Sequence, residues 1–331
     1  MANDNNTSII DYEDYEPDNF DSKLHSVFLP VVYSVTFIFG LIGNLLVIII
    51  FIFYEKVRTL TDTFLVNLAT ADMLFLCTLP FLALQAADTW KFGDVMCKII
   101  RGAYRINLYT SMLTLTCITI DRFLSITQAT KLNNFLSRKH KWGKVICVVV
   151  WMLSVILAIP QFIYSGQNCV ELYESYQTEV LVTSLQMTFG FYVPLAAILF
   201  CYASIIKTLI NASSFRKHKS IKIIVILVVV FVATQLPFNV IMLLYIIDKH
   251  YVRDTHFQTA LIITEAFAYL HACLNPVLYF FIGVKFRKKI CKMLSNLGII
   301  KHYNEQTELK NTDGYSKNIS ASTNMDAMSM H

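Results

Sequence analysis

Residues 116–126 read TCITIDRFLSI and place an acid and a base side by side, Asp121 and Arg122, at the end of an uncharged run. No residue from 106 to 120 is charged. A helix needs about 20 mainly apolar residues to cross the hydrocarbon core of a bilayer, and the window from 99 to 120 meets this length. An arginine at the end of such a helix can extend its guanidinium toward water. The stretch therefore predicts a membrane helix that ends at this pair.

Similar windows recur along the whole chain. Of 331 residues, 55% are hydrophobic and only 15% are charged, which is too apolar for an ordinary soluble domain. Besides 99–120, the windows with at most two charges are 24–54, 63–87, 145–170, 180–206, 223–247 and 255–284. We therefore expect an all-α membrane protein, a seven-transmembrane helix bundle. Because the first window follows an acidic segment and exceeds the usual length of a secretory leader, we expect an uncleaved signal anchor.

The positions of the charges predict the orientation. Lysines and arginines cluster after the first, third, fifth and seventh windows, whereas the segment before the first window is acidic. Because cytoplasmic loops are enriched in Lys and Arg, we expect the N-terminus outside and the C-terminus in the cytoplasm. The net charge of +5 then reflects a basic membrane face, so it does not indicate a nucleic-acid partner.

Motifs for other classes of function are missing from the sequence. It contains no Gly-rich phosphate loop, HExxH, CxxC or Gly-x-Ser-x-Gly motif, so we expect that the chain is not an enzyme and has no organic cofactor. A transporter using Asp72 and Glu265 as an ion relay is the alternative within the membrane class, but no inverted repeat is evident.

The eight cysteines are consistent with the expected orientation. Cys97 stands at the outer start of the third window and Cys169 lies after the fourth, on the oxidising side of the membrane. A disulfide between them would tie the outer loop over the bundle, whereas the alternative is two free thiols. Cys291 lies beside a basic cluster on the other side, where it is either acylated or an ordinary thiol.

Several motifs together carry a resemblance to a known family. They are GLIGNLL with Asn44, NLATADMLF with Asp72, Cys97, Asp121–Arg122, Trp151, Pro194, Pro237 and CLNPVLY from 273 to 279. The chain resembles rhodopsin-like G-protein-coupled receptors across all seven windows. Within that superfamily it resembles chemokine receptors, through TLP at 78–80, WKFG at 90–93, Gln235 in place of the usual tryptophan, and Glu265.

The resemblance implies that Asp121 and Arg122 form an activation switch. Arg122 would pair with Asp121 in the inactive state and would reach the G protein and Tyr202 in the active state, whereas the simpler alternative is an arginine that extends to the interface. Phe123 replaces the usual tyrosine of this motif, which removes a hydroxyl. The remaining residues of the expected switch are the helix-bending Pro237, and Asn275, Pro276 and Tyr279.

Asp72 is expected near the middle of the membrane. An unpaired carboxylate there costs at least about 2.5 kcal/mol, so it needs partners. The resemblance implies a sodium pocket, in which the ion acts as an allosteric modulator with Asp72 as its metal ligand. A protonated Asp72 bonded to Asn275 is the alternative. The expected pocket residues are Asn44, Asp72, Ser111, His271 and Asn275.

We expect the ligand to contact the receptor in two regions. The segment DYEDYEPDNFD at 11–21 surrounds Tyr12 and Tyr15 with acids, which suits tyrosine sulfation and attraction of a basic chemokine, whereas the alternative is a solvated tail. Asn5 and Asn6 begin glycosylation sequons.

The second region is expected inside the bundle. The alternative there is that Glu265 and Arg105 form an ion pair with each other and contact no ligand. Its residues are Trp90, Arg101, Tyr104, Arg105, Gln235, Glu265 and Tyr269.

The sequence also predicts the domain order and the partners. Residues 1–26 form an acidic extracellular segment, 27–283 the bundle, 284–296 a short amphipathic eighth helix along the lipid, and 297–331 a disordered cytoplasmic tail. Ser and Thr residues in that tail are candidates for phosphorylation and arrestin binding.

We expect a plasma-membrane receptor that binds a chemokine and activates an inhibitory-class heterotrimeric G protein. The alternatives are a scavenging or arrestin-biased chemokine receptor and a receptor for a different peptide.

Overall fold

The computed structural model describes residues 23–55, 59–127, 139–212, 218–247, 254–282 and 284–296. Almost all of these residues are helical, and the only β pairing among them is an isolated bridge between Ser165 and Glu171. The predicted all-α class is therefore confirmed. The elements are η2 (Leu24–Phe28), α2 (Leu29–Ile49), η3 (Ile50–Glu55), α3 (Leu60–Leu76), α4 (Leu79–Ala87), α5 (Gly93–Thr127), α6 (Lys139–Tyr164), η5 (Gln167–Cys169), α7 (Tyr176–Met187), η6 (Thr188–Tyr192), α8 (Val193–Ala212), α9 (His218–Ile247), α10 (Thr255–Tyr269), α11 (His271–Ile282) and α12 (Val284–Asn296).

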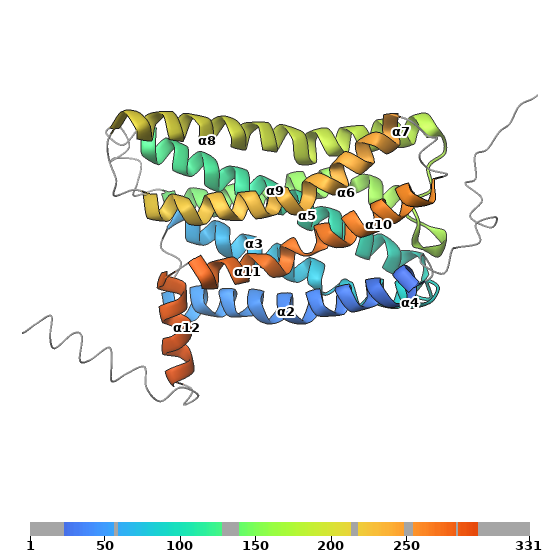
Figure 1. The fold of residues 1–331 in the computed structure, drawn as a ribbon, viewed down its shortest axis with the longest axis horizontal. Helices are drawn as coiled ribbons and strands as arrows, with labels where there is room; N and C mark the ends of the chain where they lie inside the picture. Colours follow the sequence, from blue (N-terminus) through green and yellow to red (C-terminus); the bar gives the residue numbers. More distant parts are fainter. Residues whose placement is uncertain are drawn as a thin grey trace, which may run out of the picture. The chain divides into compact units, whose positions relative to one another are not determined.

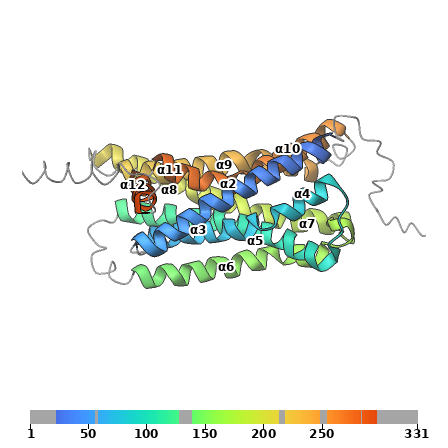
Figure 2. The same ribbon diagram turned by 90° about the horizontal axis from the view of Figure 1, so that it is seen from below.

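The chain divides into two compact units, residues 1–278 and 279–331. In the first unit, Figures 1 and 2 show α2, α3, α5, α6, α8 and α9 running side by side as a bundle of long helices. α5 is central, because it contacts α3, α6, α8 and α9. We call its Cys97 end the disulfide end and its Arg122 end the arginine end.

Seven stretches correspond to the predicted membrane helices. Six of those described are long and apolar enough to cross a membrane: Ser26–Phe53, Leu60–Ala87, Trp142–Tyr164, Tyr176–Thr208, Val225–Ile247 and Thr255–Phe280. The seventh is α5, which is more polar and packs against α3, α6, α8 and α9. Its buried polar side chains are Asn107, Thr110, Ser111, Thr114, Thr116 and Thr119.

Prolines mark several irregular points in these helices. α3 ends just before Pro80, and the Thr78 hydroxyl donates to the Phe75 carbonyl at 2.6 Å where the helix breaks. In the last span the helix breaks at Leu270 and then continues unbroken through Pro276. The helix can continue through Pro276 because another group satisfies the carbonyl that the proline leaves without a hydrogen bond. Pro276 has no N–H to offer Ala272, and Asn44 Nδ2 donates to that carbonyl instead, at 2.8 Å.

A close approach of two helices makes this bond geometrically accessible. A Cβ added to Gly43 on α2 would lie 2.7 Å from Pro276 Cβ on α11. Only glycine therefore lets the two backbones come together beside Asn44. The repaired carbonyl explains why α11 continues through its proline without a break.

The fourth span ends earlier than the uncharged window suggested. α6 stops at Tyr164, whereas the window ran to residue 170. Asn168 and Cys169 both have a φ of 56°, in the left-handed region that a continued α-helix does not use. Absence of charge therefore misled the prediction here, because the loop after α6 begins with uncharged side chains.

α12 belongs to the second unit and has the bounds expected for the amphipathic eighth helix, residues 284–296. Arg287 is exposed and Met293 is buried, as an amphipathic helix requires. Within the same unit, the Tyr279 ring lies edge-on to Phe286, with ring centroids 6.1 Å apart.

Candidate functional site

A buried polar cluster surrounds Asp72 in the middle of the bundle. Asn107 Nδ2 donates to Asp72 Oδ1 at 3.0 Å, and Asn275 Nδ2 donates to Oδ2 at 2.9 Å. All three side chains are buried and come from α3, α5 and α11. The carboxylate thus has the partners that its depth in the membrane demands. Asn275 was among the expected residues, whereas Asn107 was not.

His271 extends this cluster toward α9. Its Nε2 lies 3.1 Å from Asn107 Oδ1 and 3.9 Å from Asp72 Oδ1, and its Nδ1 lies 2.6 Å from the Ala268 carbonyl oxygen. Gln235 Nε2 donates to the same carbonyl at 3.0 Å. The helix break at Leu270 frees this carbonyl, and side chains from two helices satisfy it. Gln235 therefore contacts the cluster through this carbonyl, and its expected contact with a ligand stays a prediction.

The other two residues of the expected sodium pocket contribute oxygens. Asn44 uses its amide N–H groups on the carbonyls of Gly40 and Ala272. Asn44 Oδ1 and Ser111 Oγ are buried and have no hydrogen-bond partner among the described residues. Such oxygens, with a carboxylate, are the ligand types that hard cations take, so the donor set is chemically suited to Na⁺. No group of three His, Cys, Asp or Glu side chains that would suit a transition metal occurs in the described ranges.

Near the disulfide end, Arg101 on α5 connects the loop after α6 to α10. Its Nη2 donates to the Cys169 carbonyl at 3.0 Å, and its Nη1 lies 4.0 Å from Glu265 Oε1. The same Glu265 oxygen accepts a hydrogen bond from Tyr269 at 2.7 Å. Glu265 therefore pairs with Arg101, and not with Arg105 as the alternative supposed.

Arg105 pairs with a loop acid that the sequence did not single out. Its Nη2 lies 3.7 Å from Glu171 Oε1, and Glu171 also accepts hydrogen bonds from Gln161 at 2.9 Å and from Tyr173 at 2.7 Å. Burial alone would raise the pKa of Glu171, but the Arg105 charge and these two hydrogen bonds outweigh it and lower that pKa. The loop after α6 is thereby latched onto α5.

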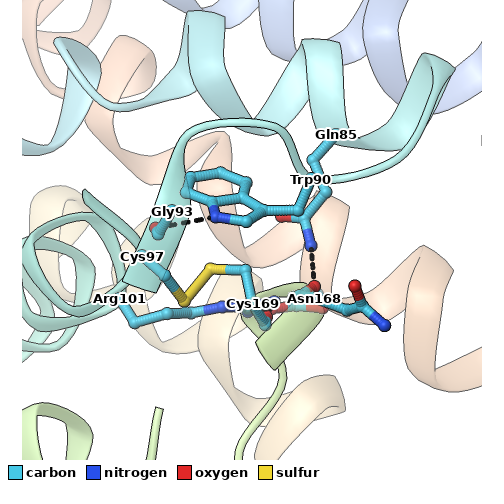
Figure 3. Close-up of a disulfide and its surroundings, with 8 residues drawn as sticks. Gln85, Trp90, Gly93, Cys97, Arg101, Asn168 and Cys169 are labelled. Atoms are coloured by element: carbon cyan, nitrogen blue, oxygen red, sulfur yellow. Dashed lines mark hydrogen bonds and ion pairs between the residues drawn. A yellow bond between two sulfur atoms is a disulfide. The ribbon is translucent and has the colours of Figure 1, made fainter. Parts of the chain in front are cut away.

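The disulfide between Cys97 and Cys169 holds this loop in place (Figure 3). Figure 3 also shows Gln85 at the end of α4 reaching the Asn168 carbonyl, a hydrogen bond of 3.3 Å. Trp90 turns its indole N–H to the Gly93 carbonyl at 2.9 Å. Three elements, α4, α5 and the loop, therefore meet at the disulfide, and the predicted bridge is present.

Aromatic side chains lie next to Glu265 in the bundle. The Tyr104 and Tyr269 rings have centroids 4.7 Å apart, and Phe75 and Tyr33 pack against Tyr269 at 5.1 and 5.5 Å. Between α5, α7, η6 and α9 a small pocket is lined by residues that include Arg105, Tyr109, Gln186 and Asn239. The aromatic cluster around Glu265 and this pocket, which Glu265 does not line, both lie toward the disulfide end, and we call the two together the basin.

At the arginine end, Arg122 Nη2 donates to Thr61 Oγ1 on α3 at 2.5 Å. The expected pairing of Arg122 with Asp121 stays a prediction. Phe123 lies edge-on to Phe200 of α8, with centroids 6.4 Å apart, and the hydroxyl of Tyr202 is buried nearby in sequence on the same helix. Thr61 carried no sequence signal, because a threonine near a helix start is common.

Some expected positions lie outside the described residues. These are the sulfation candidates Tyr12 and Tyr15, the glycosylation candidates Asn5 and Asn6, and the phosphorylation candidates of the tail. They remain predictions.

The Glu171 latch predicts a pH dependence. A carboxyl whose pKa is lowered in the folded state contributes stability above its ordinary value of 4.5, and this contribution is lost as the pH falls through the lowered pKa. In detergent at pH 7, Glu171→Gln is expected to lower the thermal midpoint by about 2 °C. The difference from the parent should vanish at acidic pH. A deficit that stays constant down to the lowest accessible pH would contradict the latch.

Comparisons with known proteins agree with this arrangement. The family model "7 transmembrane receptor (rhodopsin family)" matches residues 43–279. The human C-C chemokine receptor type 6 is 40% identical over 314 residues, covering 90% of this chain and 84% of the relative. The human C-C chemokine receptor type 9 is 37% identical over 316 residues (89% and 86%), and the bovine C-C chemokine receptor type 7 is 38% identical over 310 residues (88% and 82%).

These relatives are receptors and not enzymes, in agreement with the motifs that the sequence lacks. The matched region contains the Asp72 cluster, the two Arg–Glu pairs and the Arg122 contact. From the seven spans, the disulfide-tied loop and these similarities together, it follows that the chain is a multi-pass membrane protein belonging to the chemokine receptors of the rhodopsin family of G-protein-coupled receptors.

Proposed function

We propose that the chain binds a chemokine at its disulfide end and activates an inhibitory-class heterotrimeric G protein at its arginine end, in the plasma membrane. The observation that carries the proposal is the pairing of Glu265 with Arg101 at only 4.0 Å, beside an aromatic basin. A pair this loose in a partly exposed site is readily exchanged for another charge. The disulfide end then faces the outside, and the N-terminus lies there too.

Ligand recognition follows from charge. A basic chemokine would first meet the acidic segment with Tyr12 and Tyr15, and its N-terminal ammonium would then take the place of Arg101 on Glu265. Arg105 already pairs with Glu171, so its main role would be to hold the loop at the basin and not to bind the ligand. Trp90, Tyr104 and Tyr269 supply apolar surface around this position.

A continuous chain of contacts offers a route for the signal. Tyr269 donates to Glu265, and two residues further along the same span His271 contacts Asn107, which donates to Asp72. A ligand that moves Glu265 therefore acts on a packed polar network with alternative hydrogen-bond arrangements. Sodium held by Asp72, Ser111 and Asn44 would supply charge that favours one arrangement.

On the cytoplasmic side, the proposed partners are the G protein, arrestin and lipid. Arg122 would contact the G protein, phosphates on the tail would recruit arrestin, and α12 would lie on the inner leaflet with Arg287 toward the headgroups. Pro237 within α9 provides the point at which the arginine end of that helix can bend.

The test is nucleotide exchange on the inhibitory-class G protein in membranes that contain the receptor, measured against a panel of chemokines. One or more chemokines should stimulate exchange in the parent. If binding occurs without exchange on any G-protein class, the scavenging alternative replaces the proposal.

Glu265→Gln is expected to weaken the activating chemokine about tenfold to hundredfold, because a charge-assisted contact worth about 2 kcal/mol is lost. Glu174→Gln is the matched control, since this exposed loop acid lies outside the basin and should leave potency unchanged. Equal potency of Glu265→Gln and the parent would rule out Glu265 as the ligand contact.

A further inference from the structure

We propose that Thr61 is a positioning residue for Arg122, which holds the guanidinium against α3 and thereby limits activation in the absence of ligand. The inference rests on the proposed signalling function and adds the residue that sets its resting level. It is carried by the hydrogen bond from Arg122 Nη2 to Thr61 Oγ1, 2.5 Å long, between two side chains far apart in sequence.

The first turn of α3 places Thr61 with little freedom. Thr59 and Asp62 form a capping box, in which the Thr59 hydroxyl accepts from the Asp62 N–H at 3.1 Å and the Asp62 carboxylate accepts from the Thr59 N–H at 2.9 Å. This box fixes the start of the helix and hence the direction of the side chain between its members. Thr61 is only 9% exposed, and its hydroxyl accepts the hydrogen bond from Arg122.

An alternative anchor on α9 is excluded by the sequence of that helix. α9 contains no acidic residue along its entire length, so Arg122 has no carboxylate there to bind. A hydroxyl on α3 is the acceptor that the structure provides. A neutral acceptor holds a guanidinium less strongly than a carboxylate does, so this anchor is suited to release.

The rest of the guanidinium is incompletely satisfied. Arg122 Nε is buried and has no hydrogen-bond partner among the described residues. The Thr61 bond is therefore the contact that defines where this side chain lies. An Nη2 that donates to Thr61 is held against α3, and it must leave this acceptor to reach a protein partner beyond the arginine end. The two arrangements exclude one another, and anything that weakens the first favours the second.

Three variants test the proposal. Thr61→Val keeps the shape of the side chain and removes the acceptor, and it should raise ligand-independent nucleotide exchange about fivefold per receptor at the surface. Thr61→Ser retains a hydroxyl and should restore the parental level. Thr61→Asp turns the contact into an ion pair and should lower both ligand-independent and chemokine-stimulated exchange below the parent.

Thr63→Val is the matched control, because the Thr63 hydroxyl lies in the same helical turn but donates to the Thr59 carbonyl at 3.3 Å. It should leave exchange unchanged. Surface density and chemokine affinity, measured in parallel, separate loss of folded receptor from a shift of the switch. If Thr61→Val folds poorly, the difference between the parental exchange expected of Thr61→Ser and the lowered exchange expected of Thr61→Asp still decides.

The proposal is overturned if Thr61→Val leaves or lowers ligand-independent exchange at normal surface density, or if Thr61→Asp raises it. The parental receptor in the same assay tests the proposed function separately. Lack of chemokine-stimulated exchange in the parent would defeat that function, whereas stimulation in the parent with no effect of Thr61 variants would defeat only this inference.

Discussion

Arg122→Ala is expected to abolish chemokine-stimulated nucleotide exchange while chemokine binding at the cell surface persists. Arg122 is the cation placed at the end of the central helix, and its one hydrogen bond to a described residue is to Thr61. Alanine removes both the resting contact and the group that would engage the G protein. Because a contact that exists only in the engaged state affects activation and not ligand binding, the two readouts should separate. Exchange and chemokine binding are measured on the same membranes.

The matched control is Lys144→Ala, which removes an exposed cation at the start of α6. That end of α6 lies beside α3, because a Cβ added to Gly143 would lie 2.6 Å from Leu60. Exchange should be almost unchanged in this variant. Full stimulation of Arg122→Ala by chemokine would refute the role of Arg122, whatever the effect of the control.

Cys97→Ser is expected to reduce chemokine affinity by a factor of about 100, and Cys169→Ser should do the same. Without the bridge, the Cys169 carbonyl leaves Arg101 and the Glu171 latch on Arg105 loses its tether. Ordering that loop would then have to accompany ligand binding, which weakens the affinity. The double variant should be no worse than either single one, because both remove the same bond.

Cys77→Ser is the control for thiol chemistry in general. Cys77 is exposed and not in a disulfide, so its replacement should leave chemokine affinity as in the parent. Saturation binding on intact cells, corrected for surface density, is the measurement. Losses in the two single variants that add up in the double variant would mean that the cysteines act independently, contrary to the bridge.

Much of the fold could be predicted from hydropathy alone, because a bilayer imposes both a length and a helical backbone on every span. The windows located all seven spans. The helix ends were less accurate wherever the loop is apolar, as at residues 165–170, because hydropathy does not detect the left-handed residues Asn168 and Cys169. The break at Leu270 was also missed, since it depends on Gln235 and His271 satisfying a carbonyl from outside the backbone.

Some residues of the candidate site could be predicted from the sequence, and others could not. Asp72, Asn275 and Glu265 could be predicted, because a charge or amide within an apolar window stands out. Glu171 and Thr61 could not, because an acid in a loop and a threonine at a helix start are ordinary, and only the folded chain brings them to Arg105 and Arg122. Asn107 was available from sequence, since it lies four residues before Ser111 on the same face of α5.

The bond from Asn44 to the Ala272 carbonyl joins residues 228 positions apart. During synthesis the first span is therefore inserted long before Ala272 is made, and the Asn44 amide can form this bond only when nearly the whole bundle is present. The proline-containing last span, in turn, cannot complete its own backbone bonding until the first one arrives. Closure of the bundle is thus expected late in biogenesis, and receptors truncated before residue 272 should be retained by quality control however well their earlier helices insert.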